Sequence, residues 1–352
     1  MTPHRAPDLD RTPRWAVAAV VAAAGCGPAV APVHDVGPAP RAEIISCFDL
    51  PRKDARSHNL SGLAWDDAQH QLLAISDRDR WITPLVPEPG FAGWQLGTSI
   101  NVEVNIELWD GEALALAGDR LIIVANETQP AIFSVDRTGH GATRVELPEF
   151  RGIRDNLGLE GLSYAATDGG YVFVVNEQAL EGDGPLSSPS HGTVVRILRH
   201  SLGGKPDFAA AYVTDPIFAE GPKADNGVSD LAALSAERLL VLERAYVRGR
   251  GNAVRVYAVD LHGAHDVAAL PDARAARPLR KRLVVDVATL ADGHCSPPPM
   301  PQRRRTLDNY EGLAVGPSLP DGRRLLFMVS DDNERPTQVP RVLTVAVPRD
   351  AL

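Results

Sequence analysis

The chain has 352 residues, and its content of 44% hydrophobic and 23% charged residues provides enough apolar side chains to bury a large core. This composition excludes an intrinsically disordered chain. The formal net charge of -9 at pH 7 and the pI of about 5.6 argue against nucleic acid as a partner, because phosphates require a basic surface. The acidic balance fits a divalent cation or a neutral small molecule better.

The first 25 residues have the pattern of a bacterial export signal: an arginine-containing stretch, the apolar run 16–24, and then Gly25 and Cys26. The run is too short to span a bilayer. Residues 23–26 resemble a lipobox, whose cysteine is lipidated, although Ala23 replaces the usual leucine. Plain cleavage and a fortuitous alanine-rich stretch stay open as alternatives.

These observations predict a signal peptide over residues 1–25 and a tether rich in proline and alanine over residues 26–40. We expect an exported protein, either periplasmic or associated with the outer membrane as a lipoprotein. A lipid on Cys26 would be its contact with the membrane.

From residue 59 onward, four segments repeat one arrangement and a fifth approximates it. Each has a turn, an acidic residue, an apolar strand, a second turn, a second apolar strand, and another acidic or amide residue. The segments are residues 59–78, 110–128, 159–178, 228–245 and 310–333. Recurrence of a two-strand unit at tens of residues is the mark of a radial repeat, so the sequence predicts an all-β fold of the β-propeller type.

The later repeats are spaced more widely than the first three, so the intervals between them should hold further strands. Candidates are residues 192–198, 252–260, 281–287 and 342–347. We therefore expect six blades in a single closed domain over residues 41–352. Pairing of residues 341–348 with residues 41–50 would close the ring and remove an exposed sheet edge.

Antiparallel return of the second strand places the residue before the first strand and the residue after the second strand at one end of the channel. The first position collects Ser61, Glu112, Glu160, Asp230 and Glu311. The second position collects Asp77, Asn126 with Glu127, Asn176 with Glu177, Glu243 with Arg244, and Asp331 with Asp332. Converging carboxylates repel one another unless a cation, an arginine or a proton compensates them.

Hard oxygen ligands suit Ca²⁺ or Mg²⁺, so the sequence predicts a divalent cation, Ca²⁺ for preference, at this mouth. The predicted metal ligands are Glu112, Glu160, Asp230, Glu311, Asp77 and Asp331. The predicted catalytic residues are Glu112, Glu160 and Glu311, and the predicted ligand-binding residues are Asp230, Arg244 and His58. The structural alternative is that these acids only accept hydrogen bonds from turn N–H groups or pair with arginines.

Other catalytic signatures are missing. The sequence has no G-x-S-x-G elbow, no H-E-x-x-H, no phosphate-binding P-loop and no pair of C-x-x-C units, so serine-hydrolase, zincin and nucleotide-binding mechanisms have no support. Besides Cys26 there are Cys47 and Cys295, which either form a disulfide in an oxidising compartment or are buried separately.

In order and spacing, the segments from residue 59 to residue 347 resemble the phytase-like family, often described as "esterase-like activity of phytase". The matching phrases are SGLAWD, DGEALAL, DNLGLEGLSY, FVVNEQAL, GVSDLAAL, LLVLERA, VRVYAVDL and NYEGLAVGPSLPDGRRLLFMVSDDN. The resemblance implies a β-propeller common among exported bacterial proteins and hydrolysis of phosphate or other esters.

Two functions from different classes follow. One is a cation-dependent hydrolase of a phosphoester or related ester, acting on a small molecule, phosphorylated or not. The other is a non-catalytic envelope propeller that binds a ligand or a protein partner and uses its acids structurally.

Overall fold

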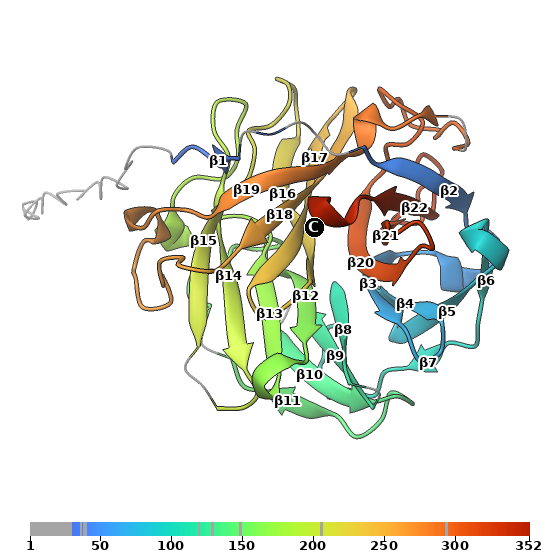
Figure 1. The fold of residues 1–352 in the computed structure, drawn as a ribbon, viewed down its shortest axis with the longest axis horizontal. Helices are drawn as coiled ribbons and strands as arrows, with labels where there is room; N and C mark the ends of the chain where they lie inside the picture. The colour runs from blue at the N-terminus through green and yellow to red at the C-terminus, as the bar shows by residue number, and fades with distance from the viewer. Residues whose placement is uncertain are drawn as a thin grey trace, which may run out of the picture.

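The computed structural model describes residues 30–35, 37, 41–118, 120–127, 130–147, 150–204, 207–292 and 295–352. The expected signal peptide and Cys26 lie outside these residues. The described chain is an all-β, propeller-like fold, whose sheets are arranged around the middle of the molecule (Figure 1).

Each repeat contributes the two inner strands of one sheet. The first sheet contains β3 (Leu60–Asp66), β4 (Gln71–Ser76), β5 (Trp81–Pro87), β6 (Trp94–Leu96) and β7 (Ile100–Asn101). The second contains β8 (Ala113–Ala117), β9 (Leu121–Asn126), β10 (Ala131–Asp136) and β11 (Thr143–Val145). The third contains β12 (Leu159–Ala165), β13 (Tyr171–Asn176), β14 (Val194–Ser201) and β15 (Phe208–Val213).

The last two sheets include strands from the N-terminal part of the chain. The fourth contains β16 (Ala224–Ala233), β17 (Arg238–Val247), β18 (Gly251–Asp260), β19 (Arg280–Asp286) and, parallel to β19, β1 (Val33–His34). The fifth contains β20 (Tyr310–Ser318), β21 (Arg324–Ser330), β22 (Arg341–Val347) and β2 (Glu43–Asp49). Strand β1 lies within the segment expected to be a tether.

Helical structure in the described residues is confined to single 3₁₀ turns. They are Ala55–Ser57, Pro89–Phe91, Thr167–Gly169, Glu181–Asp183, Ala273–Ala275, Val287–Thr289 and Arg349–Ala351. None of the helices in this part of the chain is long and apolar enough to cross a membrane.

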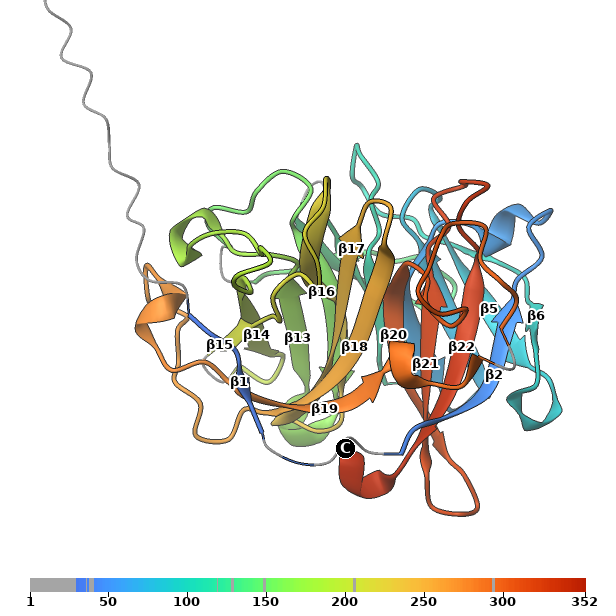
Figure 2. The same ribbon diagram turned by 90° about the horizontal axis from the view of Figure 1, so that it is seen from above.

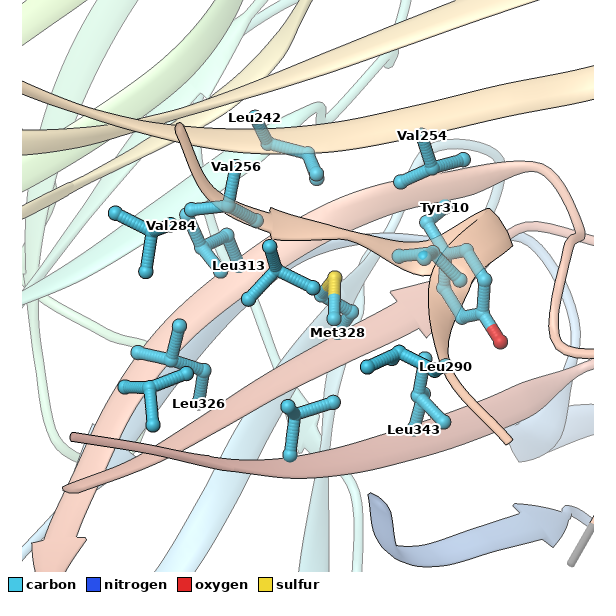
Figure 3. Close-up of a cluster of buried hydrophobic side chains, with 14 of the residues drawn as sticks. Leu242, Val254, Val256, Val284, Leu290, Tyr310, Leu313, Leu326, Met328 and Leu343 are labelled. Atoms are coloured by element: carbon cyan, nitrogen blue, oxygen red, sulfur yellow. The ribbon is translucent and has the colours of Figure 1, made fainter. Parts of the chain in front are cut away.

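The inner strands β3, β8, β12, β16 and β20 contact one another in succession, and β20 contacts β3 in turn. A cluster of buried apolar side chains fills each space between neighbouring sheets. Figure 3 shows the cluster between the fourth and fifth sheets, where Leu242 and Val256 pack with Leu313 and Met328. Because each sheet lies between two others, its inner strands are apolar on both faces.

The expectation of six blades is not met, because the described residues form five sheets. The strands anticipated in the wider intervals do exist, but they are β14, β18, β19 and β22, which extend sheets started by a repeat. A two-strand unit leaves an exposed edge, and these strands cover that edge rather than start another sheet.

The predicted pairing of the two chain ends is confirmed. Strand β2 pairs antiparallel with β22, with Cys47 opposite Leu343. A disulfide between Cys47 and Cys295 adds a covalent link from β2 to the loop that precedes β20. Strand β2, from the N-terminal part of the chain, and β22, the last strand, are thereby fastened to a single sheet.

Candidate functional site

Irregular pairing aims the predicted acids into the channel. Glu160 is an extra residue between Leu159 and Gly161 in the pairing of β12 with β13, and Glu311 is the corresponding extra residue of β20. Such a β-bulge redirects a side chain that would otherwise follow the alternation of the strand. The pairing of β3 with β4 is irregular at Ser61 and Gly62, which follow the same pattern.

The glycine after the bulge allows the inner strands to touch backbone to backbone. A Cβ at Gly62 would lie 2.6 Å from Cα of Ala113, and one at Gly312 would lie 2.5 Å from the carbonyl oxygen of Ser61. A Cβ at Gly161 would lie 2.9 Å from the amide nitrogen of Leu231. The repeated order of acid, glycine and leucine is therefore a packing requirement directly below the site.

At the end of the channel where the acids converge is a cavity of about 370 Å³. Nine carboxylates line it, against two guanidinium groups. The acids are Asp77, Asp110, Glu112, Glu127, Glu160, Glu177, Asp225, Glu311 and Asp331, and the basic residues are Arg78 and Arg244. Trp109, Asn156, Leu157, Gln178 and Asn333 complete the lining.

Two groups of acids place carboxylate oxygens within 4.8 Å of one another. They are Asp77, Asp110 and Glu112 on one side, and Glu127, Glu160 and Glu177 on the other. The Ser61 hydroxyl lies between Glu112 and Glu311, at 2.7 and 3.3 Å from their carboxylates. Either group offers three carboxylates, which are oxygen ligands of the type that a hard divalent cation takes from protein side chains.

Four of the acids that line the cavity, Asp77, Glu112, Glu160 and Glu177, hold their protons more tightly than exposed carboxyls. Burial, reinforced by the neighbouring negative charges, raises the pKa of Asp77 to about 7. Burial likewise raises the pKa of Glu177 to about 8, although Arg244 opposes the shift. The pKa values of Glu112 and Glu160 are raised well above the ordinary value, first by burial and then by nearby carboxylates. This crowding favours a bound cation or retained protons.

Arg244 is the cation among the acids. Its guanidinium lies 3.3 Å from Glu311, 3.6 Å from Glu177 and 3.8 Å from Asp225. Burial alone would lower the pKa of Arg244, but these carboxylates raise it, so the group stays charged. Its Nε atom is buried and has no hydrogen-bond partner among the described residues.

Asp230 does not line the cavity. Val228 pairs with Glu243 and Asp230 with Leu242, so the extra residue of β16 is Ser229. Ser229 therefore corresponds to Glu160 and Glu311, and Asp230 takes the place of the glycine. Burial raises the pKa of its carboxyl well above the ordinary value, although backbone N–H groups oppose the shift.

His58 also lies outside the cavity lining. Its Nδ1 lies 2.8 Å from the buried carboxylate of Asp332, and its Nε2 lies 2.8 Å from the carbonyl oxygen of Arg52. Burial would lower the pKa of His58, but hydrogen bonds to Asp332 and to that carbonyl raise it. Both ring nitrogens are therefore used within the protein.

Glu243, the acid of the second position in the fourth repeat, points away from the mouth. It lies 2.6 Å from the buried amine of Lys281 and accepts a 2.5 Å hydrogen bond from Tyr212. Asp215 lies 2.8 Å from the same amine, and this network joins the third and fourth sheets.

Of the predicted metal ligands, the structure brings Asp77, Glu112, Glu160, Glu311 and Asp331 together at the cavity. Two lining acids lie in none of the predicted positions: Asp110, two residues before Glu112, and Asp225, five residues before Asp230. Asp110 was detectable as the first residue of its repeat. Asp225 had no repeat signal, because it lies in the first part of β16, before the segment of that strand that matches the repeat.

A family model described as "Phytase-like: Esterase-like activity of phytase" matches residues 56–334. No curated protein matches the chain.

Several solved structures are similar at low identity. A streptogramin B lyase is 9% identical with a TM-score of 0.37, and the match covers 87% of this chain and 97% of that chain. A hypothetical protein from Leishmania major is 9% identical with a TM-score of 0.42, covering 87% and 91%. The PQQ-bound aldose sugar dehydrogenase from Streptomyces coelicolor is 12% identical with a TM-score of 0.39, covering 88% and 100%. These similarities are too distant to bear on function.

Proposed function

Because the chain belongs to the phytase-like family, described by its esterase-like activity, we propose that it is an exported, divalent-cation-dependent hydrolase of phosphoesters or related esters. The observation that carries this proposal is the convergence of nine carboxylates on one cavity with only two guanidinium groups to balance them. Charge of this density at a partly buried site favours a cation.

The donor set fits Ca²⁺, because every acid offers hard oxygen atoms. The Oδ1 atom of Asp77 is buried and has no hydrogen-bond partner among the described residues, which suits a ligand atom. Asp77, Asp110 and Glu112 would hold one cation, with Glu311 and Asp331 beside them. When bound, the cation supplies Lewis-acid polarisation of an ester oxygen and acidifies a bound water.

The chain's own residues have separate proposed roles. Arg244 holds an anionic group of the substrate, because its guanidinium lines the cavity and stays charged. Glu112, Glu160 and Glu311 are the proposed catalytic carboxyls. Glu160 hydrogen-bonds to Glu127, and burial raises the pKa of both carboxyls, so the pair can hold a proton and release it to a leaving group.

A second candidate function is non-catalytic ligand binding. Glu127 accepts a 2.7 Å hydrogen bond from the Gly158 amide, and Glu311 accepts one of 2.8 Å from the Asn309 side chain. In a non-catalytic scaffold, hydrogen bonds of this kind would hold the turns next to the inner strands in place. The hydrolase and the scaffold differ in whether removal of the cation removes an activity.

The test combines metal analysis of purified protein with a panel of phosphoester and carboxylester substrates, measured with and without a chelator. Glu160→Gln should remove the activity, and Glu237→Gln, which changes an exposed acid outside the cavity, should retain it. Activity that is insensitive to the chelator, or absent on every substrate with the metal bound, would contradict the proposal.

Export is a separate part of the proposal, supported by the sequence of residues 1–26. Mass spectrometry of envelope fractions should find a mature chain that begins at a lipid-modified Cys26. An intact Met1 in that material would contradict export by this route.

A further inference from the structure

The fourth repeat breaks the pattern of the others at one position. Where β3, β12 and β20 have Gly62, Gly161 and Gly312 at the backbone contact and β8 has Ala113, β16 has Asp230. The Asp230 side chain is 1% exposed, so a carboxyl group is buried where the other inner strands have only a hydrogen atom or a methyl group. A buried carboxyl at a tightly packed position requires donors, and its donors identify its role.

Asp230 binds the backbone of two neighbouring inner strands. Its Oδ2 accepts a 2.6 Å hydrogen bond from the amide of Leu313 in β20, and its Oδ1 accepts one of 2.7 Å from the amide of Leu231. The amide of Leu162 in β12 also donates to it. One side chain thus connects β12, β16 and β20.

The residues bound by Asp230 lie immediately below two acids of the cavity. Leu313 is two residues after Glu311, and Leu162 is two residues after Glu160. The neighbouring Ser229, which is 2% exposed, donates a 3.2 Å hydrogen bond to the carbonyl of Tyr310, the residue before Glu311. The bulge that carries Glu311 is therefore held on both sides by consecutive residues of β16.

We infer that Asp230 is a positioning residue, which fixes the bulges of β12 and β20 so that Glu160 and Glu311 point into the cavity together. It is not a catalytic residue or a metal ligand, because it does not line the cavity. This inference rests on the proposed function insofar as the two acids serve a bound cation.

Two variants test the inference. Asp230→Gly gives β16 the residue found at the equivalent positions, adds no atoms to the tight contact and removes the acceptor. Asp230→Asn keeps the shape but turns an N–H donor toward a backbone amide. Both should speed hydrogen–deuterium exchange in peptides covering β12 and β20, and both should weaken Ca²⁺ binding by about tenfold or more, as loss of a supporting contact does at metal sites.

Asp66→Asn is the matched control for lost stability. Asp66 is 2% exposed and pairs with Arg137 at the far end of β3, so its loss should lower the melting temperature without changing Ca²⁺ affinity. Ser229→Ala is a milder variant, whose effect on exchange should be confined to β20. A Ca²⁺ affinity of Asp230→Gly equal to that of Asp66→Asn would overturn the inference.

Failure of the proposed function gives a different result. If the wild-type protein binds no divalent cation, the hydrolase proposal fails, and the inference is decided by crystal structures of wild type and Asp230→Gly. Glu160 and Glu311 should both leave their wild-type positions in the variant. Unchanged carboxyl positions, or unchanged exchange in β12 and β20, would contradict the inference even then.

Discussion

His58 illustrates how a residue predicted to bind a ligand serves a buried charge instead. Asp332 has a fully buried side chain, and the imidazole is its closest cationic partner at 2.8 Å, with Arg52 at 3.8 Å. Removal of one member of a buried pair leaves the other desolvated and uncompensated, which is strongly destabilising. The pair therefore supports the loop after β21 rather than the chemistry of the cavity.

We predict that His58→Asn lowers the free energy of unfolding by about 3 kcal/mol and leaves Ca²⁺ binding unchanged. Because the pKa of His58 is raised in the folded state, its contribution is fully present below about pH 6.5 and is lost as the pH rises through the folded pKa. Urea unfolding at pH 6 and pH 9 should show the larger difference at pH 6. Lost Ca²⁺ affinity with unchanged stability would instead place His58 at the site.

Arg244 and Arg78 provide a matched pair within the cavity. The side chain of Arg244 is 14% exposed and contacts three acids, whereas that of Arg78 is 56% exposed and lies 3.8 Å from Asp77. We predict that Arg244→Gln raises KM for an anionic ester by at least about tenfold, because a desolvated charge-assisted contact is lost. Arg78→Gln should change KM little. Equal effects of the two variants in steady-state kinetics would contradict a specific role for Arg244.

At the scale of elements, the fifth sheet joins β2, from the N-terminal part of the chain, to the last strand, β22. Strand β22 lies between β21 and β2, and the Cys47–Cys295 disulfide spans 248 residues of sequence. A cross-link over so long a loop restricts the unfolded chain strongly.

We predict that the double variant Cys47→Ser/Cys295→Ser loses about 2 to 5 kcal/mol of unfolding free energy. Denaturant unfolding of the wild type under reducing conditions should reproduce that loss. A double variant as stable as the oxidised wild type would show that hydrogen bonding of β2 to β22 is sufficient without the cross-link.

The repeats and the cavity were predictable from sequence because each repeat has a glutamate or serine near its start and a leucine two residues later. Asp230 was misplaced because Ser229-Asp230-Leu231 offers an acid at the glycine position, and a shift of one residue in a strand moves a side chain to another face. The number of sheets could not be predicted, because the sequence of a single apolar strand does not indicate whether the strand extends an existing sheet or starts a new one. Contacts between residues far apart in the sequence, such as that of Glu243 with Lys281, could not be predicted from the sequence either.

At the scale of the whole molecule, the acids concentrate at one end of the channel. Figure 2 shows the hairpin that joins β17 to β18 at the top of the view and the C-terminus at the bottom. Asp225 and Arg244 lie toward the hairpin end of the fourth sheet, and Arg238 near the C-terminal Leu352 marks the other end. Repulsion among the carboxylates is therefore confined to this end of the channel. The loss of stability that it causes should change with pH and with bound cations.

We predict that the cation-free protein becomes less stable as the pH rises from about 5 to 8. Raised pKa values, such as about 7 for Asp77 and about 8 for Glu177, mean that the folded state binds more protons than the unfolded state across this range, so the free energy of unfolding falls as those protons leave. Melting temperatures in chelator should decline over this range, and Glu177→Gln should flatten the decline. A melting temperature that rises with pH in chelator would contradict the conclusion that the crowded carboxyls of the cavity have raised pKa values.

The most direct test of the cation-binding mouth is the Ca²⁺-induced shift of the melting temperature in wild type, Glu112→Gln and the control Glu237→Gln. Glu112 belongs to the group of acids proposed to hold the cation, whereas Glu237 is exposed outside the cavity. Binding to the folded state raises the melting temperature by mass action. We predict a rise for wild type and Glu237→Gln and no rise for Glu112→Gln. If the wild type shows no rise and Glu112→Gln is more stable than wild type with and without Ca²⁺, the acids are a crowded scaffold, and the cation site does not exist.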